Sequence, residues 1–306
     1  MGTTGQPQYL STAQAAAALA VSVSTVKRWV DEGILPAHVT AGGHRKLLLA
    51  EVLALARQGN LPRGTSEVLG GPGPGRAAPD PDALSLALRD ALVGGRGPDA
   101  GAVVRRAYEA GLPVETLADR VVAPALADVG HRWEAGRLDV WHEHRGTQLC
   151  AAALYDLKDE LEARAERDRP VAVGGAPEGD PYTLPALLAQ LVLLDAGWEA
   201  VNLGPNTPLA SLAKAVRELR PRLVWLSVAQ LRDDREFVGA YRDLYRAAER
   251  QGVAVAVGGR ALEGHVRSSM AYTTHGDGLT HLAAFVRTLH PRPKRPRRGR
   301  PGANPR

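Results

Sequence analysis

Two tryptophans and three histidines lie close together in the middle of the chain, between His131 and His144. The whole sequence of 306 residues has only five tryptophans and nine histidines, so this stretch is rich in both. Large flat apolar side chains beside imidazoles and a carboxylate (Glu143) are suited to enclosing a large planar ligand. A second interpretation is a helix–loop–helix corner with Trp133 and Trp141 in the core and the polar groups in water.

Composition narrows the classes of protein to consider. No apolar run approaches the roughly 20 residues needed to cross a bilayer. The start of the chain lacks the basic and apolar regions of a signal peptide, so we expect a cytoplasmic protein. The single cysteine, Cys150, excludes an internal disulfide and a cysteine-rich metal site.

Residues 9–57 have the pattern of a small helical DNA-binding unit. Ser11 can cap a helix over residues 12–20, and Ser24 a second helix over residues 25–32. Two helices joined by so short a turn form a helix-turn-helix. Val26, Trp29 and Val30 would face inward. The opposite side, near the helix start where recognition helices touch DNA, carries Ser24, Thr25, Lys27 and Arg28.

A wing is predicted after this second helix. Gly42 and Gly43 permit a tight turn, from which His44, Arg45 and Lys46 present hydrogen-bond donors, and a third helix over residues 49–57 closes the unit. The stretch resembles the winged helix-turn-helix of the MerR family, which implies binding to double-stranded DNA. The alternative is a small helical domain that binds protein.

Two segments have the composition of unstructured chain. Residues 58–81 are rich in glycine and proline, as in Gly70-Gly-Pro-Gly-Pro-Gly, and are predicted to be a flexible linker. Residues 291–306 contain seven Lys and Arg residues and no acid, so most of the positive charge lies there. We expect a disordered basic tail that can contact phosphate backbones.

The region between linker and tail falls into two parts. Residues 82–168 show helical periodicity, for instance at Leu84, Leu88 and Leu92, and predict a four-helix bundle ending in a long helix from Gln148. Residues 169–290 alternate short β-type runs with helical segments, which predicts a doubly wound parallel sheet of the flavodoxin-like type. The predicted strands begin at residues 171, 199, 223 and 253, and the predicted helices at residues 185, 209, 237 and 279.

A ligand of such a sheet lies beyond the carboxyl ends of the strands. The loops there are rich in small residues: Gly174–Asp180, Gly204–Thr207, Ser227–Gln230 and Gly258–Gly259. Small residues let a bulky ligand approach the backbone closely. Neither a G-x-G-x-x-G nor a Walker pattern occurs, so these loops do not predict a nucleotide site.

A helical bundle followed by this sheet resembles the cobalamin-binding module of methionine synthase. With a MerR-type head in front, the order is similar to that of the light-responsive cobalamin-dependent repressors of the CarH and LitR type. The resemblance implies that Trp133 covers the upper face of a corrin and that Glu143 and His144 contact a 5′-deoxyadenosyl ligand. It also implies that Gly204, Ser227, Gly258 and Gly259 surround the cobalamin tail.

The sequence departs from this family at both axial positions. Asp180-Pro-Tyr182-Thr-Leu-Pro185 stands where the family has Asp/Glu-x-His-x-x-Gly, so tyrosine replaces the cobalt-binding histidine. Glu134 follows Trp133 where the CarH type has a second histidine. Asp180 and Tyr182 remain candidate contacts of the lower face, and the metal ligand stays open.

The sequence therefore predicts a multidomain protein: an all-α winged helix-turn-helix head, a helical bundle and an α/β parallel sheet. The expected function is a non-enzymatic transcription regulator, acting as a homo-oligomer, with a sensor for adenosylcobalamin. The alternatives are a regulator that senses haem or a bilin, a ligand-free module that mediates oligomerisation, and a corrinoid-dependent enzyme component. An enzyme would need a substrate domain, for which residues 1–81 are too short.

Overall fold

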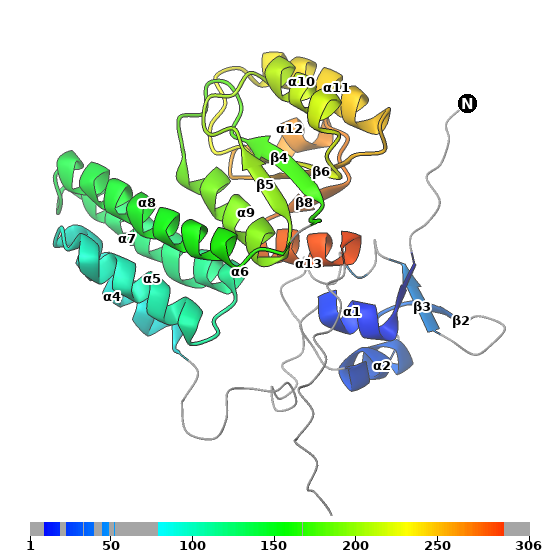
Figure 1. The fold of residues 1–306 in the computed structure, drawn as a ribbon, viewed down its shortest axis with the longest axis horizontal. Coiled ribbons are helices and arrows are strands. Elements are labelled where there is room, and N and C mark those ends of the chain that lie inside the picture. Colours follow the sequence, from blue (N-terminus) through cyan, green and yellow to red (C-terminus); the bar gives the residue numbers. More distant parts are fainter. Residues whose placement is uncertain are drawn as a thin grey trace, which may run out of the picture.

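The computed structural model describes residues 9–18, 23–32, 34–39, 45–48, 52, 79–166 and 168–290. Nearly all of the predicted third helix of the head, most of the predicted linker and the predicted basic tail lie outside these residues. Figure 1 shows the helical bundle beside the sheet domain, with α13 beneath the sheet. No described helix is both long enough and apolar enough to cross a membrane.

The head combines two helices with a small sheet. Its elements are β1 (Tyr9–Ser11), α1 (Thr12–Ala18), α2 (Val23–Asp31), β2 (Ala37–Val39) and β3 (Arg45–Leu48), with antiparallel strands in the order β1-β3-β2. Ser11 and Gln14 form a capping box: Gln14 N donates to Ser11 Oγ at 3.2 Å and Ser11 N to Gln14 Oε1 at 2.8 Å. Trp29 and Val26 are completely buried, as predicted.

Two details of the head correct the predictions. The hairpin of β2 and β3 lies where the wing was expected, and with β1 it forms a sheet, so the head is not all-α. Helix α2 begins at Val23, which puts Ser24 inside the first turn and not at the cap. Serine is common both at a helix cap and in the first helical turn, so the spacing of residues alone did not distinguish the two positions.

The bundle is built from residues 81–163. Its helices are α4 (Pro81–Val93), α5 (Gly97–Glu109), α6 (Val114–Leu117), the π-helical turn η1 (Ala118–Val122), α7 (Ala123–Glu134) and α8 (Val140–Ala163). Asp80 caps α4 by accepting from Asp82 N at 3.0 Å, and Pro81 occupies the first helical position. Helix α8 starts at Val140 and not at the predicted Gln148. Only five residues, 135–139, therefore separate it from α7.

Residues 171–289 contain a parallel sheet with strand order β5-β4-β6-β7-β8. Its elements are β4 (Val171–Gly175), α9 (Leu184–Asp195), β5 (Glu199–Asn202), α10 (Leu209–Leu219), β6 (Leu223–Ser227), α11 (Asp234–Glu249), β7 (Ala254–Gly258), α12 (Gly264–Ser268), β8 (Thr274–Gly276) and α13 (Leu279–Leu289). The predicted doubly wound order is confirmed, although β8 and α12 were not predicted. Both are too short to show a periodic pattern.

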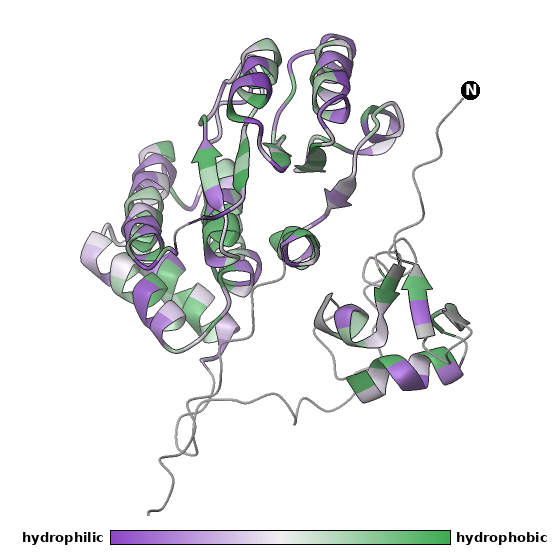
Figure 2. Ribbon diagram, turned by 45° about the vertical axis from the view of Figure 1, so that its right-hand side comes forward, coloured by the Kyte–Doolittle hydropathy of each residue, from purple (hydrophilic) through white to green (hydrophobic). Residues whose placement is uncertain are grey.

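Each face of the sheet has its own core. One core joins the bundle, α9 and α13 to sheet residues such as Ala172, Trp225 and Ala256. The other joins α10 and α11 to Val224 and Val257. Helix α9 lies between the sheet and α8 and is buried along nearly its whole length. In Figure 2 the strands and the inner helices are mostly coloured as hydrophobic, whereas the outer helices alternate.

Candidate functional site

The α7–α8 corner carries the aromatic residues singled out in the sequence. Trp133 lies in the last turn of α7 and Trp141 in the first turn of α8. The exposed fractions of the two residues are 44% and 51%. The interpretation that both tryptophans pack in the core is therefore wrong. Two half-exposed indoles at one end of a bundle provide the flat apolar surface that a large planar ligand needs.

Trp141 is held in place by its neighbours. Its ring stacks on that of His142, with centroids 3.5 Å apart, and the Arg145 guanidinium lies 4.8 Å from its centroid. Arg145 in turn donates from Nη2 to the carbonyl of Val93 at 2.8 Å, which ties α8 to the end of α4. This cation–π contact was not predicted, because Arg145 and Trp141 pair only once α8 is known to begin at Val140.

The polar groups predicted for the upper face follow Trp141 on α8. Glu143 accepts a hydrogen bond from Thr147 Oγ1 at 3.1 Å, and its other oxygen lies 3.5 Å from Nε2 of His144. His144 is exposed, with 74% of its side chain accessible, whereas the Glu143 side chain is 33% accessible. His144 is therefore free to contact a ligand, while Glu143 is already partly oriented.

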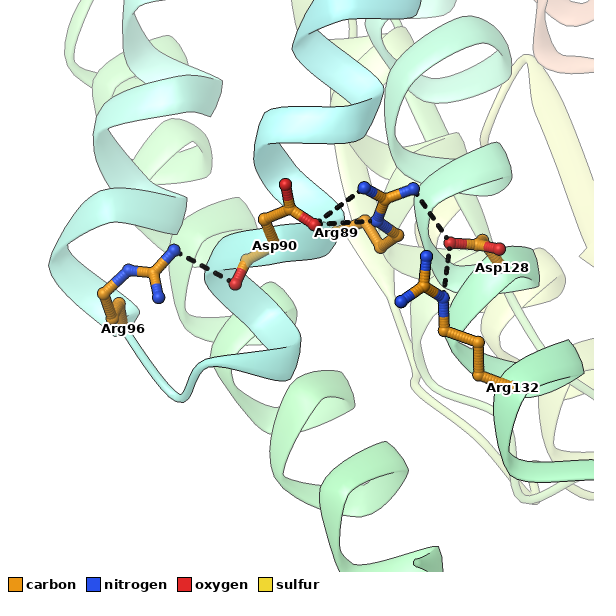
Figure 3. A network of polar contacts seen from close by, with 5 residues as sticks. All are labelled: Arg89, Asp90, Arg96, Asp128 and Arg132. Atoms are coloured by element: carbon orange, nitrogen blue, oxygen red, sulfur yellow. Dashed lines mark hydrogen bonds and ion pairs between the residues drawn. The ribbon is translucent and has the colours of Figure 1, made fainter. Parts of the chain in front are cut away.

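An ion-pair network positions the end of α7 that bears Trp133 (Figure 3). Asp128 on α7 accepts from Arg132 Nε at 3.0 Å and from Arg89 Nη1 of α4 at 3.2 Å. Arg89 also binds Asp90, and this hydrogen bond raises the pKa of the Arg89 guanidinium. The last turn of α7 is thus attached to α4 directly before Trp133.

A buried carboxylate joins the loops at the carboxyl ends of the strands. Asp180, which is completely buried, accepts from the backbone N–H of Tyr182 at 3.0 Å, Ala229 at 2.6 Å and Gln230 at 3.2 Å. Its own carbonyl accepts from Asn206 N at 2.9 Å. Asp180 therefore connects the loops after β4, β5 and β6. This accounts for its burial without a ligand.

Tyr182 lies at the surface of the same loop, with 43% of the residue exposed. The Arg260 guanidinium lies 5.1 Å from the centre of its ring, and Arg260 Nε donates to the carbonyl of Ala229 at 3.1 Å. The sequence did not identify Arg260 as a neighbour of this position. Position 182 thus carries a phenol beside a guanidinium, where the family has an imidazole.

The predicted glycines have conformations that explain the residue type. Gly204 has φ 82° and Gly259 φ 119°, both in the left-handed region. A Cβ on Gly259 would lie 2.2 Å from the carbonyl oxygen of Val228, so this loop needs glycine. Ser227 and Gly258 are register partners at the ends of β6 and β7, and Ser227 is buried.

The structure brings the predicted site residues into two separate groups. No hydrogen bond or ion pair between described residues joins the α7–α8 corner to the loops around Asp180, Ser227 and Gly258. Likewise, the described residues include no cluster of three or more His, Cys, Asp or Glu side chains that would hold a metal ion.

In the head, the predicted DNA-contacting side of α2 is accessible. Ser24, Lys27 and Arg28 are exposed, and Thr25 is half-buried. The guanidinium of Arg28 lies 3.9 Å from Glu32, too far for a strong pair. Arg45 begins β3, but its side chain lies outside the described residues, as does the whole of His44.

Comparison with known proteins finds two family models that match separate parts of the chain. A family model described as a helix-turn-helix domain matches residues 9–60, and one described as a B12 binding domain matches residues 85–158. The HTH-type transcriptional repressor CarH of Myxococcus xanthus is 36% identical over 51% of this chain and 51% of its own length. The repressor CarA of the same organism is 29% identical over 60% of this chain and 62% of its own length.

The chain thus spans about half to three fifths of the length of these two repressors. Among solved structures, the monomethylamine corrinoid protein of Methanosarcina barkeri superposes with a TM-score of 0.57 at 17% identity. The match covers 68% of this chain and 98% of the corrinoid protein, and it concerns the fold alone. The chain therefore joins a helix-turn-helix domain to a B12 binding domain.

Proposed function

We propose that this protein is a transcription regulator that binds double-stranded DNA through its head and a cobalamin through its sensor. The observation that carries the proposal is the pair of half-exposed tryptophans, Trp133 and Trp141, at the end of a bundle that matches a B12 binding domain. In the same chain, a helix-turn-helix presents Lys27 and Arg28 on an accessible face. Both matched curated repressors are named as transcriptional regulators.

The head supports binding at paired half-sites. A single winged helix-turn-helix makes few phosphate contacts and binds weakly alone, so DNA recognition by a dimer or larger homo-oligomer is part of the proposal. The ligand would control operator binding by changing this assembly. Such a regulator acts in the cytoplasm and catalyses no reaction.

The sensor contributes residues to the upper side of the ligand. Trp133 and Trp141 would cover the face of the corrin, and His144 and Glu143 would contact its upper substituent, for which the 5′-deoxyadenosyl group is the proposed form. Trp133 and Trp141 can exclude water from that face by apolar contact. Gly204, Gly258 and Gly259 would allow the ligand to approach the loops of the sheet domain.

Tyr182 favours haem as an alternative ligand, and a bilin is a further alternative. Phenolate ligates iron in some haem proteins, and a haem or a bilin would also offer a large planar surface to the indoles. Such a sensor would keep the same architecture with another tetrapyrrole.

Absorption spectroscopy tests the proposal. The purified chain is mixed separately with adenosylcobalamin, hydroxocobalamin, haemin and biliverdin, passed through a desalting column and scanned before and after illumination. Retention of a cobalamin spectrum, together with a change in DNA affinity when the ligand is added, is the expected result. Retention of haem or biliverdin in place of cobalamin would make the ligand assignment wrong. An illumination-dependent change in DNA affinity would extend the proposal to a light response.

A further inference from the structure

The sheet face that packs against α9 and α13 changes sharply in side-chain size near the carboxyl ends of its strands. The last row on this face consists of Ser227, Gly258 and Gly276, which are aligned across β6, β7 and β8. One row below, Trp225 of β6 lies between Gly174 of β4 and Ala256 of β7. A rim of very small residues thus stands directly over a large indole.

Trp225 fills the space between the sheet and the helices. It is 2% exposed and belongs to the core formed with leucines of α9 and with Phe285 and Val286 of α13. A Cβ on Gly174 would lie only 2.3 Å from Cδ2 of the indole, so glycine at position 174 makes room for Trp225. The space beneath Ser227 is occupied by packed side chains, and protein interiors of this kind hold few voids larger than a water molecule.

Trp225 takes part in this core through its apolar surface. Nε1 of Trp225 is buried and has no hydrogen-bond partner within the described part of the chain. The same holds for Nε1 of the buried Trp29 and Trp198, so the unpaired N–H is not particular to Trp225. What Trp225 contributes at this position is the apolar bulk that packs against α9 and α13.

The loop after β4, where the family has its metal ligand, contains no histidine. Both carboxylate oxygens of Asp180 accept hydrogen bonds from backbone N–H groups, which bind the loop after β4 to the loop after β6. Position 182 carries a phenol beside Arg260. Two separate observations, one in the sheet core and one in the loop after β4, therefore disagree with insertion of a nucleotide tail.

From these observations we infer that the sheet domain neither admits the nucleotide tail of a cobalamin nor ligates its cobalt. A bound cobalamin then keeps its own dimethylbenzimidazole on the metal, outside the protein core. This inference rests on the proposed function and deepens it by stating the form in which the ligand is held. Binding energy would come from the corrin face on the bundle and not from a buried tail.

Two corrinoids, one with the nucleotide tail and one without it, test the inference. Hydroxocobalamin and dicyanocobinamide, which lacks the nucleotide, are titrated separately into the full chain by calorimetry. We expect dissociation constants within about threefold of each other, since the tail makes no buried contact. The electron paramagnetic resonance spectrum of bound cob(II)alamin should show the triplet splitting of a nitrogen ligand, unchanged in ¹⁵N-labelled protein because the nitrogen belongs to the cofactor.

The opposite results separate this inference from the proposed function. Cobinamide binding more than about tenfold weaker, with loss of nitrogen splitting, would mean that the tail enters the sheet. A splitting that changes with ¹⁵N labelling would reveal a protein ligand. Either result overturns the inference while leaving a cobalamin sensor in place. If neither corrinoid binds, the proposed function fails and the inference fails with it.

A pair of core variants gives a second measurement. Trp225→Ala opens space beneath Ser227, whereas Trp198→Ala removes a completely buried tryptophan that immediately precedes β5, at the opposite ends of the strands. Trp225→Ala is expected to favour cobalamin over cobinamide by about tenfold relative to the wild type, and Trp198→Ala to leave the ratio unchanged. An unchanged ratio in a folded Trp225→Ala protein would contradict the inference. If that variant does not fold, the wild-type ratio decides.

Discussion

Arg287 of α13 forms a forked pair with Glu115 of α6, 172 residues earlier in the chain: Nη1 lies 2.6 Å from Oε1 and Nη2 3.1 Å from Oε2. The Glu115 side chain is only 9% accessible. Asp119, one turn further on, accepts from the backbone N–H of Leu279 and Thr280, both at 2.9 Å. Two carboxylates of one short segment therefore fasten both ends of α13 to the bundle.

Removal of the forked arginine is expected to destabilise this joint. Arg287→Ala leaves the Glu115 carboxylate buried without its partner. Because Arg287 itself is 47% accessible, solvent screens the pair, and we expect a loss of about 1–2 kcal/mol. The control is Arg217→Ala, which removes an exposed arginine of α10. Thermal unfolding followed by circular dichroism measures both variants. Equal unfolding midpoints of the two variants would show that the Arg287–Glu115 pair contributes nothing to stability.

The exposed indoles are predicted to bind the ligand and not to stabilise the fold. Trp133→Ala and Trp141→Ala should each weaken cobalamin binding by about tenfold or more, because each removes a large apolar contact. The free energy of unfolding should change by less than about 1 kcal/mol, since both residues are half-exposed. Tyr155→Ala, another exposed aromatic of α8, is the matched control and should bind normally. Normal binding by both tryptophan variants would rule out the corner as the site.

Substitutions of two arginines in the head are predicted to affect DNA binding in different ways. Arg28→Ala should weaken binding to a selected duplex by about 1–3 kcal/mol and relax its sequence preference. Arg45→Ala should weaken binding to all duplexes and flatten the slope of log K against log[salt] by about one. Fluorescence anisotropy over a salt series measures both, on a duplex selected from a random library. Arg105→Ala, an exposed arginine of the bundle, should have no effect.

Deletion of residues 291–306 tests the basic tail. Each phosphate that the tail neutralises should steepen log K against log[salt] by about 0.9, so the truncated chain should show a shallower slope. The selected sequence should stay the same, because phosphate contacts carry no sequence information. Identical slopes for the full-length and truncated chains would mean that the tail does not contact DNA.

The lone cysteine is predicted to be unreactive in the folded protein. Burial in the bundle raises the pKa of the Cys150 thiol from 9.0 to about 12, so the reactive thiolate is scarce at neutral pH. A thiol reagent such as DTNB at about pH 8 should modify the chain only after denaturation. Adding an exposed cysteine by Ala135→Cys supplies the positive control, which should react when folded. Rapid modification of the native wild type would mean that the bundle opens.

The sequence alone was sufficient for most of the architecture. Short β-type runs alternating with helical segments predicted the doubly wound sheet. The Ser11 cap with inward Val26 and Trp29 predicted the helix-turn-helix, although Ser24 lies inside α2 and not at its cap. These features are local: capping, periodicity and turn chemistry act over a few residues and leave a direct trace in the order of residue types.

The character of the candidate site was decided by tertiary structure. Trp133 and Trp141 lie at the surface because the other helices leave this end of the bundle uncovered. The spacing of residues in the sequence does not predict that arrangement. Likewise, Asp180 finds its N–H donors 49 and 50 residues away, on Ala229 and Gln230. Trp225 meets Gly174 only through the parallel register of β4 and β6. Such contacts form between segments distant in sequence, so the packing of the whole domain determines them.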